Sequence, residues 1–229
     1  MKSRRGILTT ILFVAAVGCT IQASPQGKPE EQDQVLKMSQ VPQKVQQAIK
    51  AYASAAEIKQ ITKGDVDGTI AYEFAIEKNG RKSEVAITPD GKFLSSEEDL
   101  PLSEFPQAAR AVVEAQAAGG KVVTTEKVVE QGKTVFEAVL EKGGKQSEIS
   151  VSPEGKIVGS QEDVALGDVP DEVRKTINAR ATGGKIISTK RILEAGKTVF
   201  EAVIEKAGKR EQISVASDGK IIETEAIKH

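Results

Sequence analysis

The chain has little of the chemistry on which most enzymes depend. Its 229 residues include one histidine, one cysteine and no tryptophan, and aromatic residues make up 3%. The histidine is the terminal His229 and the cysteine is Cys19, so no histidine-dependent triad, zinc site or cysteine protease can be assembled. A chain end is commonly frayed, which argues against a catalytic role for His229. We therefore expect a protein that is not an enzyme and that has no catalytic residue, no metal and no cofactor.

An excess of positive charge is also missing. The 32 basic residues are balanced by 33 acidic ones, and three of the basic residues, Lys2, Arg4 and Arg5, stand at the very start. A nucleic-acid interface and a polybasic lipid patch both need a surplus of basic side chains. The scarcity of aromatic residues disfavours sites that stack sugars or bases. With one cysteine, no internal disulfide can form, so the fold must be stabilised by packing.

Residues 1–18 have the form of a secretory signal. The basic start precedes an apolar run from Ile7 to Val17, which is too short for a stable membrane anchor. Ala16-Val17-Gly18 directly before Cys19 resembles a bacterial lipobox, which implies that Cys19 is the lipid attachment site of a cell-envelope lipoprotein. The alternative is ordinary cleavage after Ala23, which would give a secreted or periplasmic soluble protein. Both alternatives place the mature protein outside the cytoplasm.

The residues that follow are predicted to form a tether and then three repeats. Pro25, Gly27, Pro29 and the polar run 30–34 are typical of a segment that cannot order, so residues 19–39 are expected to be a tether. Beyond it, one pattern recurs at an offset of 64 residues, opened by Val41-Pro42, Phe105-Pro106 and Val169-Pro170. A fixed period of this length indicates duplication of a structural unit. We predict PepSY-like repeats at 40–102, 103–166 and 167–229.

Each repeat is predicted to contain one helix followed by four strands. In the third copy Val169, Val173 and Ile177 recur every four residues, and Gly183-Gly184 ends the helix. Glycine-containing turns separate the strands that follow, which in the second copy are expected at 121–129, 134–142, 146–152 and 156–160. The predicted fold is therefore α+β, with three tandem repeats that each pack one helix on a four-stranded antiparallel meander sheet. Since the connections are short, we expect adjacent repeats to abut and to extend one sheet into the next.

Alternation along the second strand of each repeat separates two faces. Tyr72, Phe74 and Ile76 are predicted to face the helix, and the residues between them the outside. Valines between acidic residues are unusual on a purely solvated sheet, and they indicate a face that binds a partner. A solvated face is the alternative. The candidate partner-binding residues are Glu73, Glu77, Val135, Glu137, Val139, Glu141, Val199, Glu201, Val203 and Glu205.

Two short motifs imitate ligand sites. Gly132-Lys133-Thr134 resembles the end of a phosphate-binding loop, but the required earlier glycine is replaced by Lys127 and a strand is expected to follow. Asp65-Val66-Asp67-Gly68 opens like a calcium loop but lacks the later ligands. Both motifs are better explained as turns.

The motifs of the repeat have a family resemblance. Val169-Pro170-Asp171-Glu172-Val173, then Gly196-Lys197-Thr198-Val199-Phe200-Glu201 and the closing Asp218-Gly219-Lys220, resemble PepSY and PepSY-like domains. They are similar to the tandem helix-plus-four-strand units of the beta-lactamase inhibitor protein. The resemblance implies a non-catalytic extracytoplasmic module, since PepSY domains are associated with regulating or inhibiting proteases and the inhibitor grips an enzyme with joined sheets. This chain has three units and few aromatic residues, so no contact residues carry over.

Taken together, these patterns predict a lipid-anchored, extracytoplasmic protein-binding module. The expected partner is a protein, for example an envelope protease or another secreted enzyme that is inhibited by steric occlusion. The alternative is a structural or adaptor cell-envelope lipoprotein without inhibitory activity. Contact with the membrane is expected only through the lipid anchor, and none with nucleic acid.

Overall fold

The computed structural model describes residues 34–53, 57–66 and 69–227. The predicted signal, Cys19, Ala23, His229 and the end of the calcium-like motif lie outside these ranges. The described residues form two compact units. The first contains the residues up to Gly80 together with Glu84–Leu94, and the second contains Arg81–Ser83 together with the residues from Ser95 onward. The limits predicted for the three repeats stay a prediction, because the division into two compact units tests none of them.

In the first unit, one helix covers one face of a short antiparallel sheet. Val45 and Ile49 of the helix are fully buried against Phe74 and Ile87 of the sheet, and Tyr72 and Ile76 join the same core. The prediction that the aromatic side of the second strand faces the helix is confirmed. The elements are β1 (Gln34–Val35), η1 (Met38–Gln40), α1 (Gln43–Tyr52), β2 (Glu57–Val66), β3 (Thr69–Lys78) and the larger part of β4 (Arg81–Ile87).

The end of the predicted tether is ordered, which corrects the expectation of a random coil up to residue 39. Strand β1 pairs with β2, and the backbone N–H of Leu36 donates to the carbonyl oxygen of Ile61 at 2.8 Å. Leu36 and Met38 also pack against the core of the first unit. Leu36 and Met38 can be buried against this core, and the edge of β2 is available for backbone pairing. Composition alone does not reveal either feature.

The second unit repeats one series of elements twice after β5 (Phe93–Asp99). The middle segment, residues 102–163, holds η2 (Leu102–Glu104), α2 (Gln107–Gln116), β6 (Lys121–Glu130), β7 (Lys133–Lys142), β8 (Lys145–Val151) and β9 (Ile157–Asp163). The last segment, residues 166–227, holds η3 (Leu166–Asp168), α3 (Asp171–Ala181), β10 (Lys185–Glu194), β11 (Lys197–Lys206), β12 (Lys209–Ala216) and β13 (Ile221–Ile227). The α+β composition and the four strands predicted for the second copy agree with these elements, although β9 runs three residues further.

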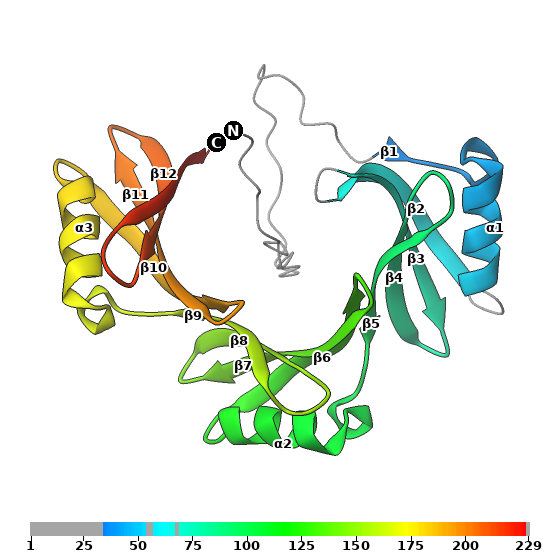
Figure 1. Ribbon diagram of the computed structural model, residues 1–229, viewed down its shortest axis with the longest axis horizontal. Coiled ribbons are helices and arrows are strands. Elements are labelled where there is room, and N and C mark those ends of the chain that lie inside the picture. The colour runs from blue at the N-terminus through cyan, green and yellow to red at the C-terminus, as the bar shows by residue number, and fades with distance from the viewer. Residues whose placement is uncertain (1–33, 54–56, 67–68, 228–229) are drawn as a thin grey trace. The chain divides into compact units, whose positions relative to one another are not determined.

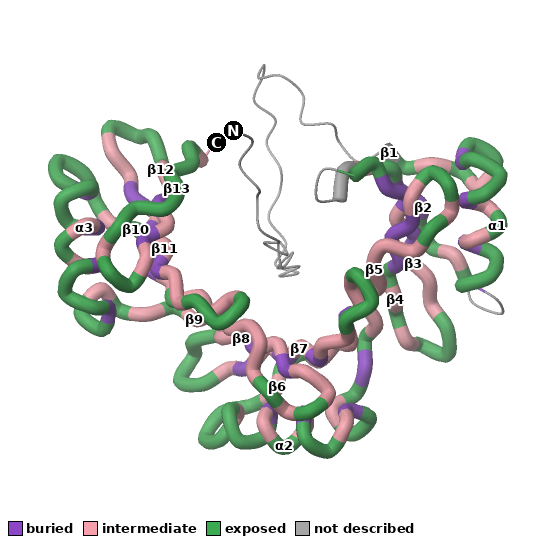
Figure 2. The backbone as a smooth tube through the Cα atoms, viewed as in Figure 1, coloured by how far each residue is buried: buried purple, intermediate pink, exposed green. Residues whose placement is uncertain are grey.

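Strands β5 to β13 lie in sequence order, and each is antiparallel to the next. Helices α2 and α3 cover the same face of this sheet (Figure 1). Ile149, which packs beneath α2, lies opposite Ser160, and Ser160 lies opposite Leu193, which is on the α3 side of β10. Directly opposed residues share a face of the sheet. Buried and half-buried positions alternate along β7 and β11 (Figure 2). No helix of the described residues lies over the opposite face, which we call the open face.

Tight turns fix the scaffold at corresponding places. Gly155 has φ of +84°, and a Cβ built on it would lie 2.9 Å from the carbonyl oxygen of Ala108 in α2. Gly219 approaches Glu172 of α3 in the same way, also at 2.9 Å. Only glycine satisfies both the left-handed backbone and the close contact, which explains the recurring acid-glycine-lysine motif. Among the described residues, no helix is both long and apolar enough to cross a membrane.

Candidate binding face

The structure places the predicted residues of β7 and β11 on the open face. Phe136, Ala138 and Leu140 contact the core under α2, so the residues between them project to the other side. The same alternation holds in β11. All eight side chains are half-buried rather than fully solvated: Val135, Glu137, Val139, Glu141, Val199, Glu201, Val203 and Glu205.

In the first unit, Glu73 and Glu77 lie on the face opposite α1, where they are half-buried. Glu77 forms an ion pair with Lys59 at 3.3 Å. The corresponding outer acids of the second unit are paired too, Glu141 with Lys121 at 3.1 Å and Glu205 with Lys185 at 3.0 Å. These three glutamates therefore already have neutralising partners within the protein.

Glu137 and Glu201 lie nearer the middle of the strands. The Ser150 hydroxyl donates to Oε1 of Glu137 at 2.7 Å, and the Ser214 hydroxyl contacts Oε1 of Glu201 at 3.5 Å. Burial raises the pKa of both carboxyl groups above the ordinary glutamate value, and the serine contacts partly oppose that rise. A serine hydroxyl supplies one hydrogen bond but no positive charge.

Three acids face one another across the neighbouring strands β5, β6 and β7. Asp99 of β5 lies opposite Glu126 of β6, and Glu126 lies opposite Glu137 of β7. We call these three residues the acidic row. Directly opposed like charges destabilise an antiparallel pair. Burial raises the pKa of Glu126, and the neighbouring Asp99 carboxylate raises it further.

Glu148 of β8 lies beside this row on the open face. It lies opposite Val139 of β7 on one side and Gln161 of β9 on the other, and Val139 in turn lies opposite Thr124 of β6. Glu148 is two residues before Ser150, whose hydroxyl contacts Glu137. Its residue surface is 6% exposed, and its Oε2 atom has no hydrogen-bond partner within the described residues. Burial raises the pKa of Glu148 to about 7, helped by the Glu137 and Glu126 charges and opposed by Lys190. Sequence reasoning did not single out this residue.

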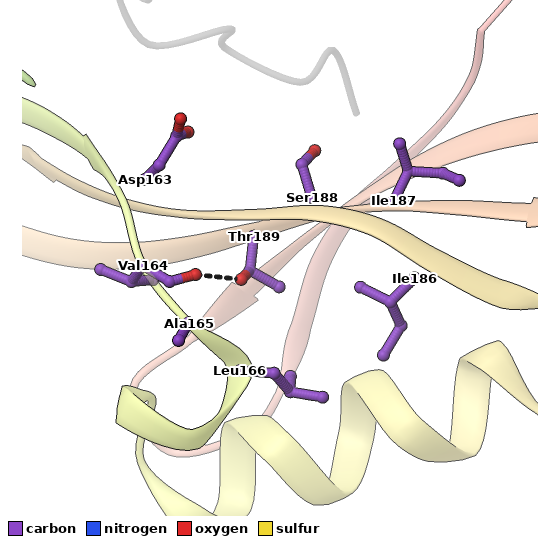
Figure 3. Close-up of a pocket in the computed structure, with 8 residues that line it drawn as sticks. All are labelled: Asp163, Val164, Ala165, Leu166, Ile186, Ile187, Ser188 and Thr189. Atoms are coloured by element: carbon purple, nitrogen blue, oxygen red, sulfur yellow. Dashed lines mark hydrogen bonds between the residues drawn. The ribbon is translucent and has the colours of Figure 1, made fainter. Parts of the chain in front are cut away.

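Two exposed apolar side chains also lie in irregular parts of the strands. The register shifts between Val122 and Thr124 in β6 and between Ile186 and Ser188 in β10. The extra residues, Val123 and Ile187, are 43% and 41% exposed. Figure 3 shows Ile187 projecting from β10 on the same side as Ser188 and Asp163, away from α3. Ser188 pairs with Val203 of the open face, so Ile187 adds apolar surface to that face.

A shallow groove of about 470 Å³ lies between the start of β10 and the connection after β9. Its lining mixes apolar and polar surface, and the Thr189 hydroxyl is already occupied by a hydrogen bond to the Val164 carbonyl oxygen (Figure 3). The polar groups of Asp163 and Ser188 point away from Leu166 on its lower side. The groove therefore contains no convergent set of groups that could do chemistry. Within the described residues, no three His, Cys, Asp or Glu side chains are grouped so as to hold a metal ion.

Comparisons with known proteins give limited likenesses. No family model matches the chain, and no curated protein matches it. A BLIP-like protein from Bacteroides fragilis matches 53% of this chain and 86% of its own, with 20% identity and a TM-score of 0.45. A DUF2874 family protein from Bacteroides ovatus matches 57% and 92%, with 16% identity and a TM-score of 0.45. The YpeB C-terminal domain of Bacillus megaterium matches 81% and 96%, with 13% identity and a TM-score of 0.25.

The resemblance to PepSY domains and to the beta-lactamase inhibitor protein stays a prediction. All three TM-scores are low, so the comparisons decide neither the family nor the function of this chain.

Proposed function

We propose that this protein is an extracytoplasmic protein-binding module that presents the open face of β5–β13 to a protein partner. The observation that carries the proposal is the composition of that face. Half-buried valines alternate with acidic side chains along β7 and β11, and exposed Val123 lies at one of its bulges. Partner interfaces in general combine an apolar centre with polar groups that set orientation.

The predicted signal and the lipobox at Cys19 support an envelope location with a lipid anchor. Residues 40–102, 103–166 and 167–229 then act as three copies of one rigid display unit. Inhibition of an envelope protease or another secreted enzyme by steric occlusion fits this arrangement, because a rigid sheet face can cover an active-site entrance without any chemistry of its own. The second candidate is a structural or adaptor lipoprotein, which would use the same face to bind an envelope scaffold.

The proposal is tested by capture from an envelope extract with the full chain, followed by identification of the captured protein and assay of its activity. Val203→Lys places a charge in the centre of the open face of the last segment and should abolish capture. Glu114→Lys, on the exposed side of α2, is the matched control and should capture as well as the parent chain. A captured hydrolase with reduced activity supports inhibition, and a captured scaffold protein with no change in activity supports the adaptor. Unchanged capture by Val203→Lys, with an unchanged melting temperature, would contradict the use of this face.

A further inference from the structure

The middle segment leaves one buried carboxylate oxygen without a donor beside a row of opposed acids. Glu148 Oε2 is the described side-chain atom that is buried and has no hydrogen bond. A buried polar group without a hydrogen-bond partner destabilises the folded protein, and more so when it is charged. The directly opposed Glu126 and Glu137 add repulsion to that cost. The fold itself gains nothing from this arrangement, since the neighbouring segment is built without it.

The last segment shows what a balanced version of the same site contains. Lys190 is the equivalent of Glu126 at the 64-residue offset, and it lies opposite Asp163 on β9 and Glu201 on β11. Its charge lowers the pKa of Glu201 against the effect of burial. A cation between two acids is therefore the arrangement that this register accommodates. In the middle segment the corresponding position is Glu126, so the cation must come from elsewhere.

We infer that the acidic row and Glu148 form the receptor for a basic side chain, a lysine or an arginine, that a protein partner presents to the open face. The inference rests on the proposed function and adds the charge of the partner and the place where it docks. The ammonium or guanidinium group takes the position that Lys190 fills in the last segment, and it donates to Glu148 Oε2 and to the carboxylates of Glu126 and Glu137.

The spacing of these groups favours a side-chain cation over a metal ion. A calcium ion needs its oxygen ligands to converge at about 2.3–2.6 Å. Here the acids come from different strands, which are about 4.8 Å apart, and the described residues contain no grouping suited to a metal. A lysine has three donors and an arginine five, which can reach carboxylates that do not converge. The aliphatic part of either side chain can also pack on Val139, which lies opposite Glu148, and on exposed Val123. Val123 is next to Thr124, the residue on the other side of Val139.

Charged groups on four other strands shift the pKa of Glu148. Glu137 on β7, Glu126 on β6 and Glu97 on β5 repel its charge, and Lys190 on β10 attracts it. Lys190 also lies opposite two other acids, Asp163 on β9 and Glu201 on β11. Arrival of a partner cation favours the ionised form of Glu148, so binding should release a proton near neutral pH and weaken as the pH falls below about 7.

The test uses a hexalysine peptide as the probe and the side-chain carboxyl carbon signals of the full chain as the readout. Hexalysine should shift the Glu148, Glu137 and Glu126 signals in a saturable way and lower the pKa of Glu148 from about 7, and hexaglutamate should do neither. Glu126→Lys places the cation within the protein and should weaken peptide binding by about tenfold or more. Glu114→Lys makes the same charge change on the helix side and should bind like the parent chain.

Three results would overturn the inference: equal shifts of all exposed carboxyl groups, unchanged peptide binding by Glu126→Lys, and the same perturbation by calcium chloride at lower concentration than the peptide. The last result would indicate a metal site instead. The capture experiment distinguishes failure of the basic-anchor inference from failure of the proposed function. If Val203→Lys loses the partner but Glu126→Lys keeps it, the open face binds without a basic anchor. If both variants keep the partner, the face itself is not the binding surface.

Discussion

The middle and last segments of the second unit share a scaffold but differ in the charge of one row. Asp99, Glu126 and Glu137 face one another across β5, β6 and β7, whereas the equivalent positions on β9, β10 and β11 alternate in sign. Those positions are Asp163, Lys190 and Glu201. Their backbones follow the same register, including a bulge at the same place in β6 and β10. The difference therefore lies in side-chain charge alone, and it shows that the scaffold does not require an acidic centre.

A second difference concerns the residue next to that row. Glu148 occupies the position that Gln212 occupies in the last segment, opposite a valine in both cases. An amide at this position can lie buried without a charge, but a carboxylate cannot unless it is protonated or paired. The middle segment thus combines two features that destabilise it, and both are absent from its neighbour. Since they coincide on an open face, they are more simply explained by a ligand than by folding.

The largest expected effect tests whether the two segments are one cooperative structure. Ile149 and Ile213 occupy equivalent buried positions beneath α2 and α3. Truncating either one to alanine should cost about 2–5 kcal/mol through lost burial and the cavity left behind. Because β9 pairs with β10, each variant should lower the midpoint of one shared calorimetric transition. Two transitions, of which only one moves in each variant, would show that the segments unfold separately.

The next largest effect is a pH dependence of stability that depends on Glu148. Its pKa in the folded protein, about 7, is above its ordinary value of 4.5. Between these two pH values the folded chain binds the proton and the unfolded chain does not. The free energy of unfolding should therefore fall as the pH rises from about 4.5 to 7, by about 3 kcal/mol at most.

Glu148→Gln copies the last segment at this position and should remove most of that dependence. The variant should melt at a higher temperature than the parent chain at pH 8 and at nearly the same temperature at pH 5. Glu114→Gln, on the exposed face of α2, is the control and should melt like the parent at both pH values. An unchanged difference between pH 5 and pH 8 in Glu148→Gln would show that another group causes the dependence.

A smaller effect is expected when the last segment is given the charge row of the middle one. Lys190→Glu places a third acid between Asp163 and Glu201 and removes the attraction to Glu148. We expect a loss of about 1–2 kcal/mol at pH 8, because opposed like charges replace opposed unlike charges on both sides. Urea unfolding at low and high salt measures it, and the loss should shrink in high salt. Lys220→Glu, which changes an exposed lysine in a turn, should cost much less.

Much of the scaffold could be predicted from the sequence because the turn residues mark where each strand ends. Asn79-Gly80 and Gly143-Gly144 have positive φ at both residues, as expected of primed hairpin turns, and Ala207-Gly208 adopts the same turn despite its alanine. The end of β9 was missed because Gln161, Glu162 and Asp163 are polar, and their backbone pairing with β10 cannot be recognised from composition.

The centre of the candidate site could not be predicted, because its residues meet only through the register. Counting by twos from Val122, which lies on the helix side, would place Glu126 on the helix side as well. The bulge at Val123 reverses the alternation, so Glu126 emerges on the open face opposite Glu137. In the sequence, Glu148 is one more polar residue of an alternating strand, and the charges that shift its pKa come from four other strands. The sequence alone contains the residues but not the pairing that brings their charges together.

The smallest expected effect concerns the junction between the two segments. The guanidinium of Arg191 on β10 donates from Nε to Oε1 of Glu162 on β9 at 3.0 Å, and both side chains are well exposed to solvent. Glu162→Gln should therefore cost no more than about 1 kcal/mol, since exposed ion pairs contribute little. At the β5–β6 junction the equivalent acid, Glu98, instead contacts Arg81 at 3.5 Å, and the strands pair over the same five positions. Backbone pairing thus forms the junction with either arrangement of charges. A loss of more than about 2 kcal/mol in Glu162→Gln, measured by urea unfolding, would show that the β9–β10 junction depends on this ion pair and differs from the β5–β6 junction in kind.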